Sequence, residues 1–319
     1  MYTPFGVPET EDLETNLFFV NHRFDRDDLF FQISSYFRRH KDDYEFNRRD
    51  PGAFNPFEHT TEVFDFTLEG GWVLDDWNIV SRIEWLQDDI ESTSLTFGDF
   101  TSRSYLKGGF MLETNHDDGV RPWTFSGGVS FDHNNRGSSE LSPMARISTG
   151  GTTSSGTNWQ FYADVSRSTQ VPGYTAIASN PGGGLFRGNP NLVREIATNF
   201  EVGYLASSGN LQFQAATFIR ADRDLVDWTY AFDVFGRTAN NVDIDTTGLE
   251  LLLSYQFDKG RMVAGYTTLS KDEDYGNTLV DASFYALNFA KHRATFAFIY
   301  ELARGVEIRL DNVFRIQQD

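Results

Sequence analysis

Apolar and polar residues alternate with a period of two along most of the chain. The run 199–204, for example, reads Asn-Phe-Glu-Val-Gly-Tyr. This alternation predicts strands with one apolar face and one polar face. We count about fourteen candidate strands and almost no helical pattern. Clear examples are the runs 13–24, 29–40, 62–74, 123–131, 249–257 and 305–317.

The lengths of the strands and of their connections favour a membrane barrel. Many runs reach ten residues, whereas ordinary strands have about five or six and a tilted transmembrane strand needs about nine to eleven. Short connections alternate with longer ones, as in a meander whose tight turns all lie at one end. The short ones are 25–28, 75–77, 117–119, 150–156, 207–209, 258–260 and 303–305. The longer ones are 41–60, 87–99, 134–140, 169–195, 223–241 and 272–288. We therefore predict an all-β fold, an antiparallel up-and-down transmembrane β-barrel.

Composition agrees with a barrel that is apolar outside and charged inside. The chain has 319 residues with 30 Phe, 27 Gly and a formal net charge of −19, and no run of eighteen apolar residues that would form a spanning helix. In hydrocarbon the strands must form a closed barrel, and a lipid-facing Arg or Lys costs about 2–4 kcal/mol. We expect Phe200 to face lipid and Glu201 the lumen. The expected interfacial aromatic belt comprises Trp72, Trp85, Trp123 and Trp159.

Other functional classes find little support in the sequence. The excess of 46 Asp and Glu over 27 Lys and Arg argues against binding nucleic acid. The absence of Cys excludes disulfides and thiolate metal sites, and the six His residues show no metal-binding spacing. The acidic run 272–274 either binds Ca²⁺ or is a solvated hairpin tip. We expect no catalysis, no cofactor and no resident metal.

One segment carries a recognisable series of motifs. The run 166–204, SRSTQVPGYTAIASNPGGGLFRGNPNLVREIATNFEVGY, resembles the signature of TonB-dependent outer-membrane receptors. The matching features are Arg167, Pro172, Tyr174, Gly188–Leu192, Glu195 and Asn199–Gly203. The run 246–257, TTGLELLLSYQF, resembles the later Gly-x-Glu strand of such barrels. Arg194 departs from the pattern, because family members often have proline before the glutamate. The strand pattern extends the resemblance over essentially the whole chain.

The resemblance implies a role and a larger protein. Such receptors have a signal peptide, a TonB-binding segment, a plug domain and about twenty-two strands. We expect residues 1–319 to be a fragment of that barrel with about 14 of 22 strands, without the plug and the last strand. The implied function is import of a scarce nutrient, such as a ferric siderophore or cobalamin, with energy from the TonB complex acting through the absent plug segment. The implied location is the cell outer membrane, in contact with its lipid.

Candidate ligand contacts lie in the long loops. Aromatic residues with Arg suit a bulky, partly anionic ligand. The alternative is that these aromatic residues pack the loops against one another, and that Arg167 and Tyr174 anchor the loop 169–195. The candidates are Tyr44, Arg48, Arg49, Phe54, Phe57, Arg167, Tyr174, Trp228, Tyr230, Phe235 and Arg237.

Two other functional classes stay open at this point. One is a soluble secreted all-β protein that binds a ligand or polysaccharide, and the other is a porin without a plug. A porin would not need the Gly-Asn-Pro-x-Leu loop, and a soluble domain would not need charges on one parity of long strands.

Overall fold

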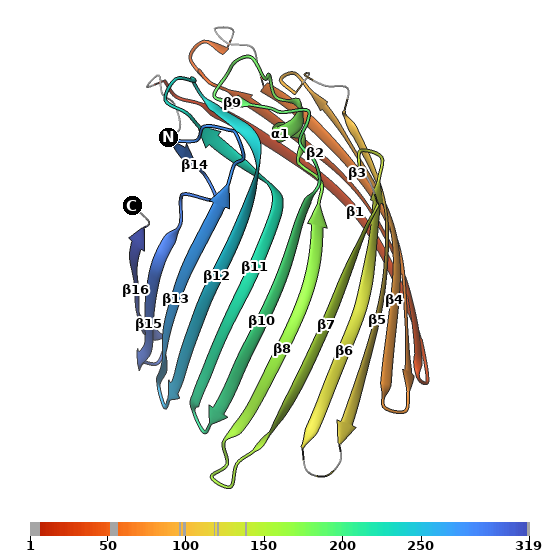
Figure 1. The fold of residues 1–319 in the computed structure, drawn as a ribbon, viewed down its shortest axis with the longest axis vertical. Helices are drawn as coiled ribbons and strands as arrows, with labels where there is room; N and C mark the ends of the chain where they lie inside the picture. Colours follow the sequence, from red (N-terminus) through yellow and green to blue (C-terminus); the bar gives the residue numbers. More distant parts are fainter. Residues whose placement is uncertain are drawn as a thin grey trace.

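The computed structural model is one antiparallel sheet of long, tilted strands (Figure 1). It describes residues 7–51, 57–95, 97, 100–117, 119, 121–137 and 139–317. The strands are β1 (Thr10–Arg26), β2 (Leu29–Glu45), β3 (Phe57–Leu74), β4 (Trp77–Ser92), β5 (Ser102–Asp117), β6 (Pro122–Asn134), β7 (Glu140–Thr152), β8 (Asn158–Gln170), β9 (Phe186–Arg187), β10 (Glu195–Ser208), β11 (Leu211–Tyr230), β12 (Arg237–Phe257), β13 (Gly260–Asp274), β14 (Ala282–Ser283), β15 (Ala290–Ala303) and β16 (Val306–Gln317), and one short helix is α1 (Tyr174–Ala178). The predicted all-β class is confirmed.

The order of strands in the sheet follows the chain. Each long strand is hydrogen-bonded to the next one, from β1 through β8, then β10 to β13, and finally β15 and β16. The two-residue strands lie off this path, β9 parallel to β12 and β14 antiparallel to β11. The sheet is strongly curved and does not close, with β1 and β16 at its two edges (Figure 1). This is the predicted up-and-down topology of a partial barrel.

Short and long connections lie at opposite ends of the sheet, as predicted. The tight turns after β1, β3 and β10 contain Asp27, Asp75 and Gly209, which have φ angles of 50°, 48° and 54°. Left-handed backbone of this kind suits glycine and, among other residues, Asp and Asn. The longer connections, with α1, β9 and β14, gather at the other end (Figure 1). We call these the turn end and the loop end.

Polar and apolar side chains separate onto the two faces of the sheet. One row of paired residues runs across six strands and is largely polar: Tyr162, Gly203, Ala216, Glu250, Thr267 and Arg293. The adjacent row, one residue along each strand, is apolar or aromatic: Phe161, Tyr204, Ala215, Leu251, Tyr266 and Ala294. Phe200 shares the apolar face and is 49% exposed. An alternation that holds over so many strands is the one expected of a membrane barrel.

The position of α1 identifies the concave face. Tyr174 contacts Asp88 of β4, and Ala176 packs with Ala239 of β12. Strands so distant in the sheet order can touch one helix only if that helix lies on the concave side. Asp88 belongs to the polar parity of β4, so the polar face lines the lumen.

Buried apolar residues are confined to the loop end. They form three small clusters around α1, the upper part of β12 and the segment 275–289. With five residues, α1 is the one helix in the described ranges, and no helix there is long and apolar enough to cross a membrane.

Several details of the sequence prediction are wrong. The expected connections 41–60 and 87–99 are shorter than predicted, because β2 continues to Glu45, β3 starts at Phe57 and β4 continues to Ser92. The expected loop 223–241 is largely strand, because β11 continues to Tyr230 and β12 starts at Arg237. Both faces of this extension are covered by other segments at the loop end, so the alternation that marks a lipid-facing strand is lost there. Trp85 is not at a strand end, as an interfacial belt requires. It lies in the body of β4, where its ring centroid is 5.6 Å from that of Phe64.

Candidate functional site

The segment 171–194 folds onto the concave face and is anchored first through Tyr174. Its hydroxyl donates to Asp88 Oδ1 at 2.5 Å, and the Asp88 carbonyl oxygen lies 3.0 Å from the same hydroxyl. Arg103 of β5 donates to both carboxylate oxygens of Asp88 and lies 4.1 Å from the Tyr174 ring. Burial, followed by the hydrogen bond to Asp88, raises the pKa of Tyr174. The tyrosine therefore holds α1 against the wall as a neutral donor.

The Gly-Asn-Pro-x-Leu motif is fixed at a second point. A side chain at Gly188 would lie 2.6 Å from the Ser179 carbonyl oxygen, so only glycine permits this close approach to the end of α1. Arg136, after β6, donates to the carbonyls of Pro190 and Leu192 at 2.9 and 3.0 Å. The motif thus sets the path of the chain between α1 and β10.

A recess of about 650 Å³ lies between α1 and the loop ends of β10 to β13. Phe218 and Trp228 supply apolar surface, and Glu195 and Lys271 supply charge. Burial, with a smaller contribution from the charge of Asp222, raises the pKa of Glu195 to about 7. Burial also lowers the pKa of Lys271, whose ammonium donates to a backbone carbonyl at 2.9 Å. The recess can accommodate a group with an apolar face and a few polar atoms.

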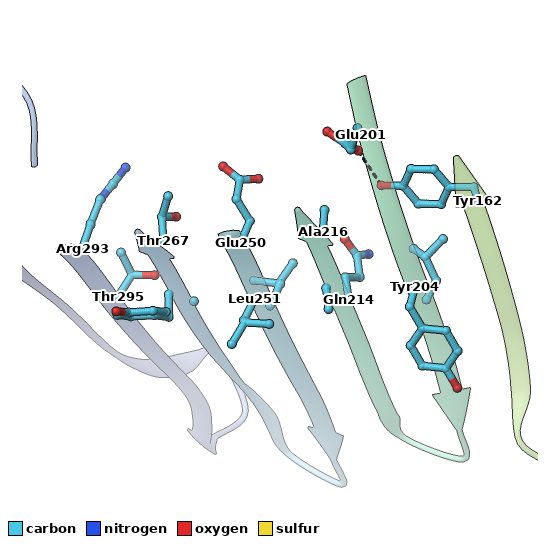
Figure 2. Close-up of a pocket in the computed structure, with 15 residues that line it drawn as sticks. Tyr162, Glu201, Tyr204, Gln214, Ala216, Glu250, Leu251, Thr267, Arg293 and Thr295 are labelled. Carbon is cyan, nitrogen blue, oxygen red and sulfur yellow. Dashed lines mark hydrogen bonds between the residues drawn. The ribbon is translucent and has the colours of Figure 1, made fainter. Parts of the chain in front are cut away.

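The motif strand of β10 forms a tight contact below this recess. The Tyr162 hydroxyl donates to Glu201 Oε1 at 2.6 Å (Figure 2). Both residues line a shallow pocket of about 350 Å³. A Cβ at Gly203 would lie 2.2 Å from Cζ of Tyr162. Gly248, in the Gly-x-Glu strand, lies under Phe218 in the same way, at 2.3 Å. Glycine in both motifs therefore makes room for an aromatic ring from the neighbouring strand.

Aromatic residues and arginine meet where β9, β11 and β12 end. Phe186 contacts Trp228 edge-on with centroids 5.2 Å apart, and the Arg237 guanidinium lies 4.1 Å from the Phe284 ring. Tyr230 contacts Phe232 at 5.8 Å. Among the predicted ligand contacts, the structure thus brings Trp228, Tyr230 and Arg237 into one region at the loop end.

Beside this region, the connection between β11 and β12 exposes large apolar side chains. Phe232 is 79% exposed and Phe235 is 71% exposed. Exposed aromatic residues at the rim of a lumen can make first contact with an arriving ligand.

The remaining predicted contacts lie elsewhere. Tyr44 and Phe57 are paired across β2 and β3, and both contact Phe46, at 4.9 and 5.1 Å. Arg48 and Arg49 are exposed beside them. Arg167 of β8 pairs with Glu140 at 3.1 Å, and Phe54 lies outside the described residues.

Sequence reasoning missed the residue that fixes the segment 275–289. Asp227 is completely buried, and its carboxylate accepts the backbone N–H groups of Phe284, Tyr285 and Ala286 at 3.0 to 3.1 Å. The Tyr275 hydroxyl adds a fourth hydrogen bond at 3.2 Å. In an acidic chain, nothing in the sequence distinguishes this Asp from its solvated neighbours. No group of three or more His, Cys, Asp or Glu that could hold a metal occurs in the part of the chain that is described.

These features define a class of protein, the wall of a large up-and-down β-barrel with a segment folded into its lumen. The family model "TonB dependent receptor-like, beta-barrel" matches residues 2–312. The chain belongs to this family, and the resemblance found in the motifs is confirmed. The family consists of transport receptors. No curated protein sequence matches the chain.

Solved structures of siderophore receptors share the fold. PirA from Pseudomonas aeruginosa has a TM-score of 0.69 and 13% identity, over 96% of this chain and 54% of that one. PirA from Acinetobacter baumannii has a TM-score of 0.73 and 13% identity, over 95% and 50%. A mutant of the ferric enterobactin receptor PfeA from Pseudomonas aeruginosa has 0.71 and 14%, over 96% and 49%. The chain spans about half the length of these proteins.

Proposed function

We propose that this chain is the barrel part of an outer-membrane receptor that imports an iron chelate of the siderophore type. Family membership over residues 2–312 carries the proposal. The fold shared with siderophore receptors supports the choice of ligand. In this proposal the apolar face of the sheet contacts lipid, the loop end is extracellular and the turn end is periplasmic.

The barrel performs binding and passage, not covalent chemistry. The exposed Phe232 and Phe235 make first contact with the chelate, and Trp228 and Arg237 line its way toward the recess beneath α1. Aromatic faces and a guanidinium bind the flat, delocalised groups of a metal chelate through stacking and charge. Tyr230 and the group Tyr44, Arg48, Arg49 and Phe57 are candidate contacts on the same end of the sheet.

Release into the periplasm requires energy from the TonB complex. In the proposed receptor, the TonB complex acts through a plug segment that lies outside this chain. The segment 171–194 lies between the rim and the lumen, held to the wall by Tyr174 and Arg136. We propose that it narrows the passage, so that a bulky chelate does not diffuse through without the energy-dependent step.

Uptake of radioactive iron chelates by iron-limited cells tests this function. Cells lacking the receptor should lose uptake of the transported chelate, and a protonophore should stop uptake in cells with the receptor while leaving surface binding intact. Phe232→Ser with Phe235→Ser should weaken binding about tenfold, the equivalent of about 1.4 kcal/mol. Lys259→Ser, in the turn after β12, is the matched control and should have no effect.

The outcomes separate the competing classes. Uptake that continues with the protonophore would identify a passive porin and contradict the proposal. A receptor recovered in the soluble fraction would favour a soluble binding protein.

A further inference from the structure

A third cavity, of about 510 Å³, lies between the turn that follows β6 and the segment that leads into β10. Its lining includes Asn134, Arg136, Gly137 and Arg194. Arg194 is the position at which the chain departs from the family pattern, so the motif does not explain it. This cavity is distinct from the recess beneath α1, which has none of these four residues in its lining.

Arg194 is buried, with 9% of its surface exposed, and uses only part of its guanidinium. Its Nη1 donates to Asp132 and to the Thr169 hydroxyl. In the described part of the chain, Nε and Nη2 have no hydrogen-bond partner. Buried donors without a partner cost free energy comparable to a lost hydrogen bond, about 1–3 kcal/mol each. Two of them on one side chain call for an acceptor.

Asn134 presents a third donor at the same place. It is 2% exposed, and its Oδ1 accepts the backbone N–H groups of Arg136 and Gly137 at 2.9 and 2.8 Å. These two bonds fix the orientation of the amide, because only the oxygen can accept. Its Nδ2 is therefore a donor, and it has no partner among the described residues.

The two side chains converge beside Gly137. A Cβ built on that glycine would lie 3.7 Å from Asn134 Oδ1 and 3.8 Å from Arg194 Nε. The Asn134 amide and the Arg194 guanidinium thus lie next to each other beside Gly137, and all three residues line the cavity.

The charges around the cavity favour an anion at this end. Asp132 is paired with Arg194, and Glu140 with Arg167. Arg136 donates to backbone carbonyls and forms no ion pair with a described carboxylate, so its charge is uncompensated. The lining also includes Asp224, at the β11 bulge.

We propose that this cavity binds a small oxyanion, a carboxylate or a phosphate group, through Asn134 Nδ2 and through Nε and Nη2 of Arg194. Two oxygens of such a group match the parallel N–H bonds of a guanidinium, and a third accepts from the amide. The oxyanion is either free in solution or a substituent of the transported chelate. It joins the segment that leads into β10 to the turn after β6.

The test uses the full-length receptor in detergent, with inorganic phosphate and acetate as probes. The midpoint of thermal unfolding is measured against anion concentration, at constant ionic strength maintained with chloride. Binding to the folded state alone raises the midpoint and yields an apparent Kd. We expect phosphate, acetate or both to stabilise the native receptor.

Two variants remove donors while keeping the local fold. Asn134→Asp keeps the oxygen that accepts from Arg136 and Gly137, and replaces the donor with an acceptor. Arg194→Lys keeps the charge opposite Asp132 and lacks Nε and Nη2. Each should raise the apparent Kd about tenfold or more. Arg146→Lys is the control, because Arg146 pairs with Asp164 on the wall outside this cavity, and it should leave the Kd unchanged.

If neither anion stabilises the native receptor, or if Asn134→Asp responds as the native protein does, the oxyanion site is refuted. Chelate binding with and without saturating anion then distinguishes the sources. Competition means that the chelate supplies the oxyanion, and independence means a separate anion site. Neither result bears on whether the receptor imports iron, which the uptake assay decides.

Discussion

Any side chain at Gly203 would collide with the ring of Tyr162, because a Cβ there would lie 2.2 Å from Tyr162 Cζ. The Tyr162 ring covers it and lies between Gly203 and the Arg146 guanidinium, which is 4.1 Å from the ring centroid. The ring can move only by giving up these contacts and its hydrogen bond to Glu201. The Asn-x-Glu-x-Gly motif is therefore a packing unit shared between β8 and β10.

Gly203→Ala should reduce the free energy of unfolding by about 1–3 kcal/mol, the usual cost of overpacking. Gly109→Ala is the matched control, since a Cβ there has no atom within 4 Å, and it should change stability little. Urea unfolding of the full-length receptor in lipid vesicles measures both. Equal effects of the two substitutions would contradict the packing role.

Glu195 should make stability depend on pH. Burial raises its folded pKa to about 7, above the ordinary value of 4.5, so folding favours the protonated form. The resulting stability is fully present below about pH 4.5 and is lost as pH rises through 7. Glu195→Gln should remove this component. The stability difference between variant and native receptor should therefore grow in favour of the variant between pH 4.5 and 8, as followed by unfolding in urea. A constant difference across that range would show that the carboxyl is not buried in the folded receptor.

At the scale of the strand, the alternation of faces makes neighbouring positions differ in cost. Phe125 of β6 lies on the apolar face and is 44% exposed, whereas the Ser126 hydroxyl donates to Glu113 at 2.9 Å on the concave face. Phe125→Arg should cost about 2–4 kcal/mol in the assembled barrel. Ser126→Arg should cost much less, because the new cation lies beside Glu113. Unfolding of the full-length protein in lipid compares them, and similar losses at both positions would refute the assignment of faces.

The sequence predicts the strands well but not the contacts of the candidate site. Alternation predicted the strands because lipid on one side and the lumen on the other impose it on every spanning segment. It fails at the loop end of β11 and β12, where other segments cover both faces, so the sequence places Trp228 and Arg237 in a loop. The candidate site depends on long-range contacts such as Tyr174 with Asp88 and Asp227 with the segment 275–289. Local sequence carries no record of these partners.

At the scale of the whole molecule, the two ends of the curved sheet differ. The longer connections gather at the loop end, while the turn end has tight connections (Figure 1). Residues at the loop end also line the recess beneath α1 and the cavity beside Arg194. A receptor that captures ligand outside the cell must present the loop end to the medium. Orientation in the membrane is thus the property that joins the fold to the proposed function.

Labelling of single cysteines on intact cells tests this orientation, because the native chain has no Cys. Cysteines at Pro181 and Ala231, in connections at the loop end, should react with an impermeant maleimide added outside. Cysteines at Ser208, Lys259 and Arg304, at the turn end, should react only after the outer membrane is permeabilised. The permeabilised sample is the control for accessibility, since every one of these sites should then be labelled. If the turn-end sites react on intact cells, the barrel has the opposite orientation, and the aromatic rim cannot be where ligand enters.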